Sequence, residues 1–103
     1  MIGCEKPWVT LLATHYKRLE CVFELVNTFW EYNEYPYVKF LVIDDCSGED
    51  IQDTLKKKLS VDCLVLNDKN IGQGQSICNG LRSIDTPYVM LLDDDMYFVV
   101  HCK

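Results

Sequence analysis

The sequence predicts an α/β fold built on a parallel sheet of about four strands flanked by helices. Short apolar runs alternate with helical segments along the chain, in the order βαβαβαβ. The apolar runs are continuous rather than alternating with polar residues, which is typical of strands covered by helices on both faces. Polar residues follow three of the four runs directly, at the edge where parallel sheets bind ligands. Together these observations predict a Rossmann-like architecture.

The first expected strand is the apolar run "WVTLLAT" at residues 8–14. Residues 18–32 then carry apolar side chains at the i, i+3, i+4 spacing of one helix face, which predicts an amphipathic helix. The predicted face consists of Leu19, Val22, Phe23, Val26 and Trp30. Phe29 lies beside it, and we expect these aromatic side chains in the core. Asn33 and Pro36 are turn residues that end the helix.

The second expected strand is "VKFLVI" at residues 38–43, followed by the polar turn "DDCSGED". Residues 50–59 form a short, mostly exposed helix, and "CLVL" at residues 63–66 forms the third strand. The segment "NDKNIGQGQ" is polar and contains glycine, so we expect a loop there.

The last helix is expected at residues 76–84, where Ile77, Leu81 and Ile84 share one face. The dipeptide "TP" stops it, and "YVMLL" at residues 88–92 is the fourth strand.

Composition favours one globular domain over residues 1–103. Hydrophobic residues make up 49% of the chain and charged residues 25%, which is typical of a folded protein. The formal net charge is −6, which argues against a nucleic-acid partner, because phosphate backbones attract basic surfaces. Acidic clusters suit divalent cations instead.

The chain has six cysteines and no CxxC pair, so a zinc knuckle is not expected. Three disulfides remain open as an alternative. Several cysteines lie within apolar runs, which favours buried thiols in a reducing compartment, and we expect a cytoplasmic protein. The N-terminus has no apolar signal-peptide core, and no stretch reaches the ~18 apolar residues that span a bilayer.

Two adjacent carboxylates, Asp44 and Asp45, end the second expected strand. For Asp44 and Ser47 we favour a structural role, in which the side chain caps the next helix or accepts from turn amides. For Asp45 we favour a functional role, because two strand-end carboxylates exceed what one cap needs.

Three consecutive carboxylates, Asp93, Asp94 and Asp95, follow the fourth expected strand. One interpretation is a solvated polar turn. The other is a cation site, because adjacent carboxylates raise each other's pKa unless a cation neutralises them. Mn²⁺ or Mg²⁺ would take these oxygens together with substrate phosphates. Alternate residues of an extended segment point the same way, so Asp93 and Asp95 are expected to serve one site while Asp94 faces elsewhere.

The remaining polar candidates are weaker. The segment around Gly72 and Gly74 matches neither the dinucleotide fingerprint nor the P-loop. Its glycines either form the turn into a helix or let the backbone approach a ligand near that helix N-terminus. We interpret His15 as a strand-end polar group rather than a ligand. His101 lies close to the chain end and is left out of the predicted site.

Four segments, "VTLLATHYKR", "FLVIDDCSGED", "NIGQGQSICNG" and "YVMLLDDDM", occur in an order and at a spacing that resemble a known family. The chain is similar to the nucleotide-binding half of inverting family 2 glycosyltransferases, which have the GT-A fold. The resemblance implies that Thr14 lines the base pocket, that Tyr16 stacks on uracil and that Asp45 accepts a hydrogen bond from the base imide.

The resemblance also implies a diphosphate end of the site. Asp93 would meet the ribose, and Asp95, with Asp93, would hold a Mn²⁺ or Mg²⁺ ion that bridges the diphosphate. Asp94 is grouped with the nucleotide-binding residues, and Gly72 would lie beside the nucleotide. The implied ligand is a nucleoside diphosphate sugar, with a uridine diphosphate sugar expected and the acceptor unknown.

The chain departs from the family pattern in two ways. Thr14, Lys17 and Cys46 stand where proline, asparagine and glycine are common. Family catalytic domains are also considerably longer, and no residue here matches their acidic general base. We therefore expect a truncated donor-binding domain.

Two alternatives to a donor-binding domain remain. The first is a non-catalytic nucleotide-sugar-binding or assembly module that lacks the acceptor half. The second, a receiver-type phosphoacceptor domain suggested by "IDDCS", is disfavoured, because the acidic pair follows the second strand and no lysine ends a later one. We also expect that an exposed strand edge allows a homodimer.

Overall fold

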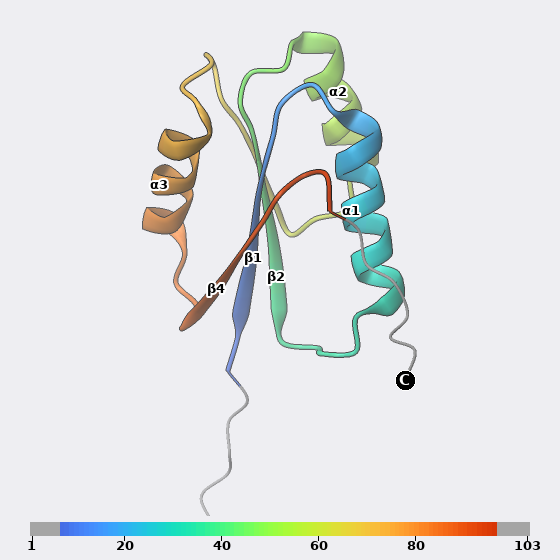
Figure 1. Ribbon diagram of the computed structural model, residues 1–103, viewed down its shortest axis with the longest axis vertical. Coiled ribbons are helices and arrows are strands. Elements are labelled where there is room, and N and C mark those ends of the chain that lie inside the picture. The colour runs from blue at the N-terminus through green and yellow to red at the C-terminus, as the bar shows by residue number, and fades with distance from the viewer. Residues whose placement is uncertain (1–6, 97–103) are drawn as a thin grey trace, which may run out of the picture.

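In the computed structural model, which describes residues 7–96, a parallel sheet lies between helices on its two faces (Figure 1). The elements follow the order β1 (Val9–His15), α1 (Leu19–Tyr32), β2 (Val38–Asp44), α2 (Glu49–Lys58), β3 (Cys63–Leu66), α3 (Gln73–Ser83) and β4 (Tyr88–Leu92). The four strands are arranged in the order β3-β2-β1-β4. The predicted α/β fold with a four-stranded parallel sheet is confirmed.

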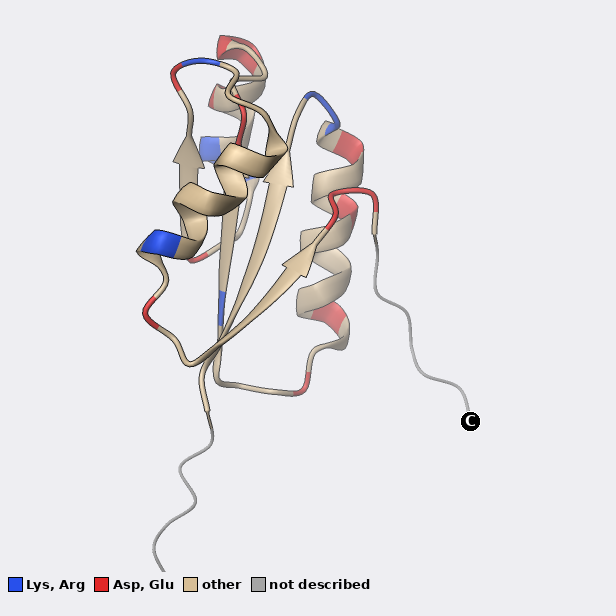
Figure 2. Cartoon of the chain, turned by 60° about the vertical axis from the view of Figure 1, so that its left-hand side comes forward, with Lys and Arg blue, Asp and Glu red and all other residues tan. Residues whose placement is uncertain are grey.

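All strands run in the same direction, so their carboxyl ends meet at one edge of the sheet (Figure 2). The chain adds β2 and β3 on one side of β1 and then crosses over to add β4 on the other side. The crevice outside the carboxyl ends of β1 and β4 is therefore a topological switch point, where open α/β sheets bind ligands.

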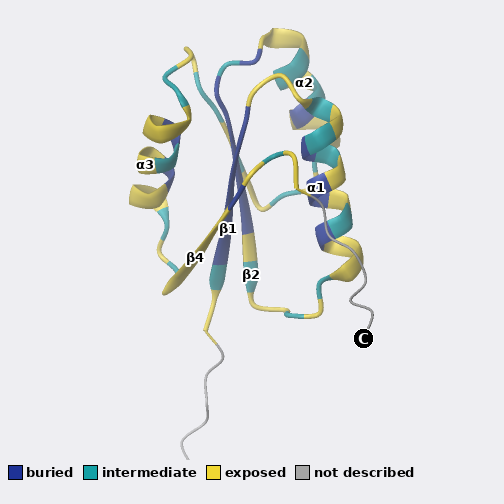
Figure 3. Ribbon diagram, viewed as in Figure 1, coloured by how far each residue is buried: buried dark blue, intermediate teal, exposed yellow. Residues whose placement is uncertain are grey.

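Successive side chains of the central strands enter two different cores, because strand residues alternate between faces. On the side of α1 and α2, Leu11 and Phe40 belong to the larger cluster. On the side of α3, Leu12, Leu41 and Ile43 form a smaller cluster against Ile77 and Ile84. Burial is concentrated in β1 and β2 and on the inner faces of the helices (Figure 3).

The buried face of α1 differs from the predicted one. It consists of Val22, Leu25, Val26 and Phe29. The prediction that Trp30 lies in the core is wrong, because its side chain is 41% exposed. Its indole Nε1–H donates to the Ser60 carbonyl oxygen at 2.7 Å, at the surface. An indole with a polar N–H favours such a position, where its ring covers apolar surface and its donor is satisfied.

Helix α3 begins at Gln73, three residues before the predicted start at residue 76. Its contact with the sheet depends on Gly80, where an added Cβ would lie 2.7 Å from the Ile43 Cδ1 atom. The prediction that Leu81 shares the buried face is wrong, because this side chain is 43% exposed. The small residues Ser76 and Gly80 are buried instead, so the helix packs closely on the sheet.

The expectation of strands covered on both faces fails for both edge strands, since two of the four β3 residues are exposed, and it fails most clearly for β4. Four of its five residues are exposed, with Tyr88 at 58% and Leu91 at 53%. Strand β4 is an edge strand, and within residues 7–96 no element covers it on the outer side. It therefore presents an apolar edge to solvent.

The cysteines also differ from expectation. Cys63 and Cys78 are exposed, so the prediction of buried thiols is wrong for these two, while Cys21 and Cys46 are partly buried. All four are free thiols. Cys4, Cys102 and His101 lie outside the described residues. None of the helices within residues 7–96 is long and apolar enough to cross a bilayer.

Candidate functional site

A cleft of about 510 Å³ lies at the carboxyl edge of the sheet, at the switch point between β1 and β4. It is lined by Thr14, His15, Tyr16, Arg18, Asp45, Asn70, Gln73, Asp93, Asp94 and Asp95. Six of the seven site residues predicted from the sequence are in this set. The seventh, Gly72, is not in the lining but directly precedes Gln73, which is.

The loop after β1 is fixed by His15, which is almost completely buried. The His15 Nε2 atom accepts a hydrogen bond from the Arg18 backbone N–H at 2.9 Å. The ring proton therefore lies on Nδ1, which donates to Asp44 at 2.8 Å. The interpretation of His15 as a strand-end polar group is confirmed, and the histidine holds the turn that carries Tyr16 and Arg18 into the cleft.

Asp44 is a buried structural anchor. Its carboxylate accepts from the Ser47 backbone N–H at 3.0 Å, from the Ser47 hydroxyl and from the Gln52 side-chain amide at 2.8 Å. Burial by itself raises the pKa of Asp44, but the hydrogen bonds from His15, Ser47 and Gln52 outweigh it and lower the pKa from 3.8 to about 2. The predicted structural role of Asp44 is confirmed, through a turn amide rather than a helix cap.

Asp45 joins the end of β2 to the start of α3. Its two carboxylate oxygens accept from the backbone N–H groups of Ile71 and Gly72 at 2.8 and 2.9 Å. The Asn67 side-chain amide donates to the same carboxylate at 3.2 Å. Although Asp45 lines the cleft, it is only 5% exposed, so most of its hydrogen-bonding capacity serves the loop before α3.

Gly72 occupies the turn that opens α3. Its φ of 90° lies in the left-handed region that residues with a side chain rarely adopt, which explains why glycine occupies this position. Its carbonyl accepts from the Ser76 backbone N–H at 3.0 Å, the first hydrogen bond of the helix. The interpretation of Gly72 as a turn into the helix is confirmed, and approach to a ligand stays a prediction.

The acidic residues after β4 form a turn rather than an extended segment. The Met96 backbone N–H donates to the Asp93 carbonyl at 3.2 Å, with Asp94 and Asp95 at the centre of the turn. The argument from alternating directions is therefore wrong, and Asp94 does not face elsewhere. All three carboxylates line the same cleft, with Asp93 and Asp95 exposed and Asp94 partly buried.

Arg18 supplies positive charge to this turn. Its Nη1 atom lies 3.6 Å from the Asp94 Oδ1 atom and 3.7 Å from the Asp95 Oδ2 atom. Burial raises the pKa of Asp94, while the charge of Arg18 and a hydrogen bond from the Tyr16 backbone act in the opposite direction. Arg18 therefore offsets part of the repulsion within the acidic turn.

The cleft offers oxygen ligands for a cation but no complete protein cage. Among residues 7–96, no three His, Cys, Asp or Glu side chains converge on a common metal position. Mg²⁺ and Mn²⁺ often bind through one or two carboxylates plus the phosphates of a ligand. The exposed carboxylates of Asp93 and Asp95 fit such a shared site, and hard oxygen donors suit these metals.

Four residues of the cleft lining were not among the predicted site residues: Arg18, Asn70, Gln73 and His15, the last of which was interpreted as a strand-end polar group. Asn70 and Gln73 follow the third strand, which ends at the same edge as the others, and they belong to the segment "NIGQGQSICNG", but no role in the site was predicted for them. The Asn70 side-chain amide donates to the Asp45 carbonyl at 3.2 Å, so it supports the cleft wall. Arg18 is the last residue of "VTLLATHYKR", but no role was predicted for it, because a basic residue beside a helix start is ordinary.

Comparison with known proteins places this chain in a sequence family. The sequence model of glycosyl transferase family 2 matches residues 13–102. No curated protein sequence matches the chain.

Solved structures share the fold at low sequence identity. A mannosyltransferase, PcManGT from Pyrobaculum calidifontis, in complex with GDP-Man and Mn²⁺, aligns with a TM-score of 0.80 and 18% identity over 94% of this chain. TarS residues 1–349 from S. aureus, in complex with UDP-GlcNAc, align with a TM-score of 0.73 and 21% identity over 87% of this chain. The chain spans 30% and 27% of the lengths of these two proteins.

Proposed function

The chain belongs to glycosyl transferase family 2, and from this premise we propose that its cleft binds a nucleoside diphosphate sugar together with a divalent cation. One observation carries the proposal. The fold brings the loop after β1, the end of β2 and the acidic turn after β4 to one cleft, although these segments are far apart in the sequence. The cleft thus combines an exposed aromatic ring with carboxylates, as a base and a metal-bound diphosphate require.

We assign the base to the side of Tyr16 and Thr14. The Tyr16 side chain is 44% exposed and lines the cleft, with Lys17 Nζ 5.2 Å from the ring centroid, so we propose that the other face of the ring stacks on a nucleobase. A carboxylate has about four lone-pair positions, and Asp45 uses three for Ile71, Gly72 and Asn67. One remains for the imide N–H of a uracil, which makes the proposed contact compatible with the loop that Asp45 holds.

We assign the diphosphate to the acidic turn. Asp95 and Asp93 are the proposed cation ligands, and Asp93 is also the proposed contact to the ribose. Asp94, partly buried beside Arg18, keeps the turn in place and is a nucleotide-binding residue through that position. A bound divalent cation would stabilise the negative charge that develops on the leaving diphosphate.

The acceptor side is a separate proposal. Because the chain spans less than a third of the length of the two structural relatives, we propose that residues 1–103 are a donor-binding domain without the acceptor half. The alternative is a non-catalytic nucleotide-sugar-binding or assembly module. A sugar-transfer assay tests this alternative, since measurable turnover by this chain alone rejects it.

Calorimetric titration with uridine diphosphate, with and without Mn²⁺, tests the donor site. We expect uridine diphosphate to bind only when Mn²⁺ is present. In Asp95→Ala we expect most of the affinity for uridine diphosphate to be lost, and the remaining binding to be independent of Mn²⁺. Asp85→Ala is a matched control, because Asp85 is exposed and precedes β4 at the opposite edge of the sheet. Guanosine diphosphate, titrated in parallel, tests the proposed preference for uracil. Absence of binding, or equal binding by Asp95→Ala, contradicts the proposal.

A homodimer through β4 also remains a proposal. Tyr88, Met90 and Leu91 are exposed on this edge strand, and apolar edge strands favour pairing with another chain. Light scattering would then give a mass near twice the 12.0 kDa of one chain, whereas a monomeric mass contradicts the pairing.

A cytoplasmic location is likewise a proposal. It is supported by the four free cysteines among residues 7–96, which fit a reducing compartment. Alkylation of these thiols in intact cells, read by mass spectrometry, tests it. Disulfide-bonded Cys63 or Cys78 in the cell would contradict it.

A further inference from the structure

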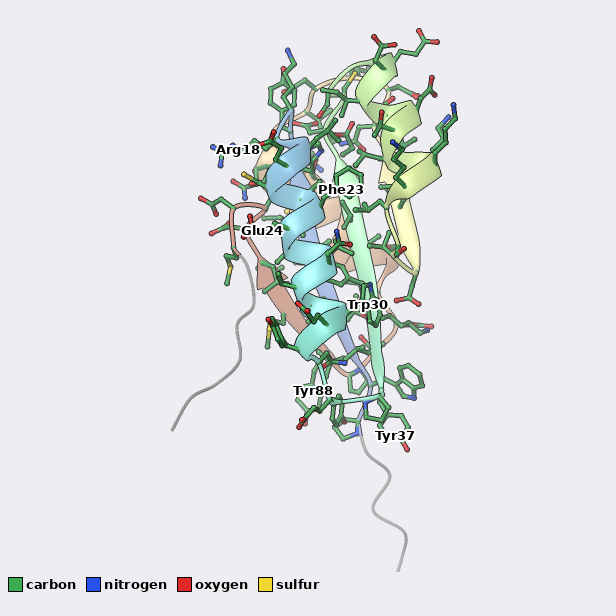
Figure 4. The ribbon with its side chains drawn as sticks, turned by 90° about the vertical axis from the view of Figure 1, so that its right-hand side faces the viewer. Arg18, Phe23, Glu24, Trp30, Tyr37 and Tyr88 are labelled. Carbon is green, nitrogen blue, oxygen red and sulfur yellow. The ribbon has the colours of Figure 1, made fainter. Side chains whose placement is uncertain are left out.

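Arg18 is the residue of the cleft whose role neither the sequence motifs nor the donor assignment explains. Its side chain extends from the start of α1 toward the turn after β4 (Figure 4). Its Nη1 atom lies 3.6 and 3.7 Å from carboxylate oxygens of Asp94 and Asp95, beyond hydrogen-bonding distance. The contact is a charge pair without fixed geometry, which makes it easy to replace.

The two ends of Arg18 are held very differently. Its backbone N–H is fixed by the buried His15 ring at 2.9 Å, whereas its side chain is 57% exposed. The guanidinium is therefore tethered beside the cleft but free to change rotamer. Lys17, the neighbouring cation, lies over the Tyr16 ring at 5.2 Å instead, so the sequence neighbour does not duplicate the contact.

We propose that Arg18 is an exchangeable counter-charge: its guanidinium neutralises Asp94 and Asp95 until a divalent cation binds Asp95 together with Asp93, and it then turns to the diphosphate of the donor. The inference rests on the proposed function of the cleft. A guanidinium and a divalent cation repel each other, so a cation bound at Asp95 weakens the contact of Arg18 with the acidic turn. The diphosphate is a strong alternative partner, because its oxygens match the planar N–H donors of arginine.

The exchange makes cation and nucleotide binding cooperative. Without nucleotide, a cation has to displace Arg18 from the acidic turn, which weakens its binding. With nucleotide, the diphosphate takes the guanidinium and leaves the carboxylates to the cation. By linkage, each ligand raises the affinity for the other by the same factor.

The test compares Arg18→Gln with Arg82→Gln and Arg18→Lys. Arg82 lies in the last turn of α3 and is exposed, so its replacement removes the same charge away from the acidic turn (Figure 2). Free Mn²⁺, measured by electron paramagnetic resonance without nucleotide, gives the cation affinity. We expect Arg18→Gln to bind Mn²⁺ about three- to tenfold more tightly than wild type. Arg82→Gln and Arg18→Lys should stay within about twofold.

The same measurement at saturating uridine diphosphate gives the cooperativity. We expect nucleotide to raise the Mn²⁺ affinity of the wild type by at least about fivefold, and that of Arg18→Gln distinctly less. Equal or weaker Mn²⁺ binding by Arg18→Gln without nucleotide overturns the inference, as does an unchanged nucleotide effect. If wild type does not bind uridine diphosphate with Mn²⁺ at all, the proposed function of the cleft fails instead.

A second measurement needs no variant. In the wild-type chain, titration with Mg²⁺ should shift the NMR resonance of the Arg18 side-chain Nε–H, because the guanidinium leaves its carboxylates. The Arg82 resonance is the internal control. An Arg18 resonance that stays in place while Mg²⁺ saturates the acidic turn overturns the exchange.

Discussion

The His15 Nδ1 atom lies 2.8 Å from the Asp44 Oδ1 atom, and both side chains are almost completely buried. Each Asp44 oxygen accepts two hydrogen bonds, Oδ1 from His15 and the Ser47 hydroxyl, and Oδ2 from the Ser47 backbone and Gln52. The carboxylate therefore has no free lone pair for a ligand. The Asp44 carboxylate connects the loops after β1 and β2, which form one side of the cleft.

This network predicts a loss of stability in acid. The native pKa of Asp44 is about 2, below its ordinary value of 3.8, so the folded state favours the ionised form. The resulting stabilisation is fully present above pH 4 and is lost as the pH falls toward 2. It amounts to about 2 kcal/mol. Urea unfolding at pH 7, 4 and 2.5 measures it as a fall in the free energy of unfolding.

Asp44→Asn isolates the contribution of this one carboxyl. The amide of asparagine cannot accept four hydrogen bonds, so we expect a loss of about 3 kcal/mol at pH 7 and a shallower fall in acid. Asp53→Asn, an exposed residue of α2, should change stability by less than about 0.5 kcal/mol. An Asp44→Asn curve parallel to that of wild type between pH 4 and 2.5 would refute the assignment.

Asp45 should control the mobility of the segment before α3. In Asp45→Asn the side chain keeps one acceptor oxygen, so one of the bonds to Ile71 and Gly72 is lost. We expect amide hydrogen exchange at Ile71 and Gly72 to accelerate by about tenfold. Exchange at Leu12, in the central strand β1, is the reference and should change much less. Equal acceleration at all three sites would indicate global destabilisation instead.

Gly80 should tolerate no branched side chain. A Cβ there would meet Ile43 at 2.7 Å and Leu12 at 3.1 Å, in the core between α3 and the sheet. We expect Gly80→Val to lower the free energy of unfolding by about 1–3 kcal/mol, measured by urea unfolding. Gly74→Ala is the matched control in the same helix, since nothing lies within 4 Å of its added Cβ. It should leave stability unchanged or raise it by up to about 1 kcal/mol.

Two variants of Tyr16 distinguish stacking of the ring on a base from hydrogen bonding by the hydroxyl group. If its ring stacks on the base, Tyr16→Ala should weaken binding of uridine diphosphate with Mn²⁺ by about 1–3 kcal/mol, as base–aromatic stacking does elsewhere. Tyr16→Phe keeps the ring and should bind within about threefold of wild type. Calorimetric titration of both variants measures the difference. Equal weakening in the two would assign the contribution to the hydroxyl group.

The sequence was most informative where local pattern and topology agree. Strands β3 and β4 occupy the predicted ranges, and the position of Asp45 and Asp93 at one edge follows from parallel strands alone. The fold and six of the ten residues that line the cleft were therefore predictable from apolar runs and from the polar residues that end them.

Side-chain detail was less predictable, because tertiary contacts decide it. Helix α1 is apolar on more than one side, so the pattern did not distinguish the stripe with Leu25 and Phe29 from the one with Trp30. The first turn of α3 looked like a loop because Gly72 and Gly74 have low helix propensity, which the anchoring by Asp45 overrides. The contact of Arg18 with Asp94 joins residues from opposite ends of the chain.

The cleft has two sides that are held by different forces. Buried hydrogen bonds of Asp44 and Asp45 hold the loops after β1, β2 and β3, whereas Arg18 reaches the turn after β4 from an exposed position. Dissolved salt screens exposed charges and hardly affects buried hydrogen bonds. Ionic strength therefore acts mainly on the side of the acidic turn, where it weakens both the attraction of Arg18 and the repulsion among the three carboxylates, while the opposite side stays in place.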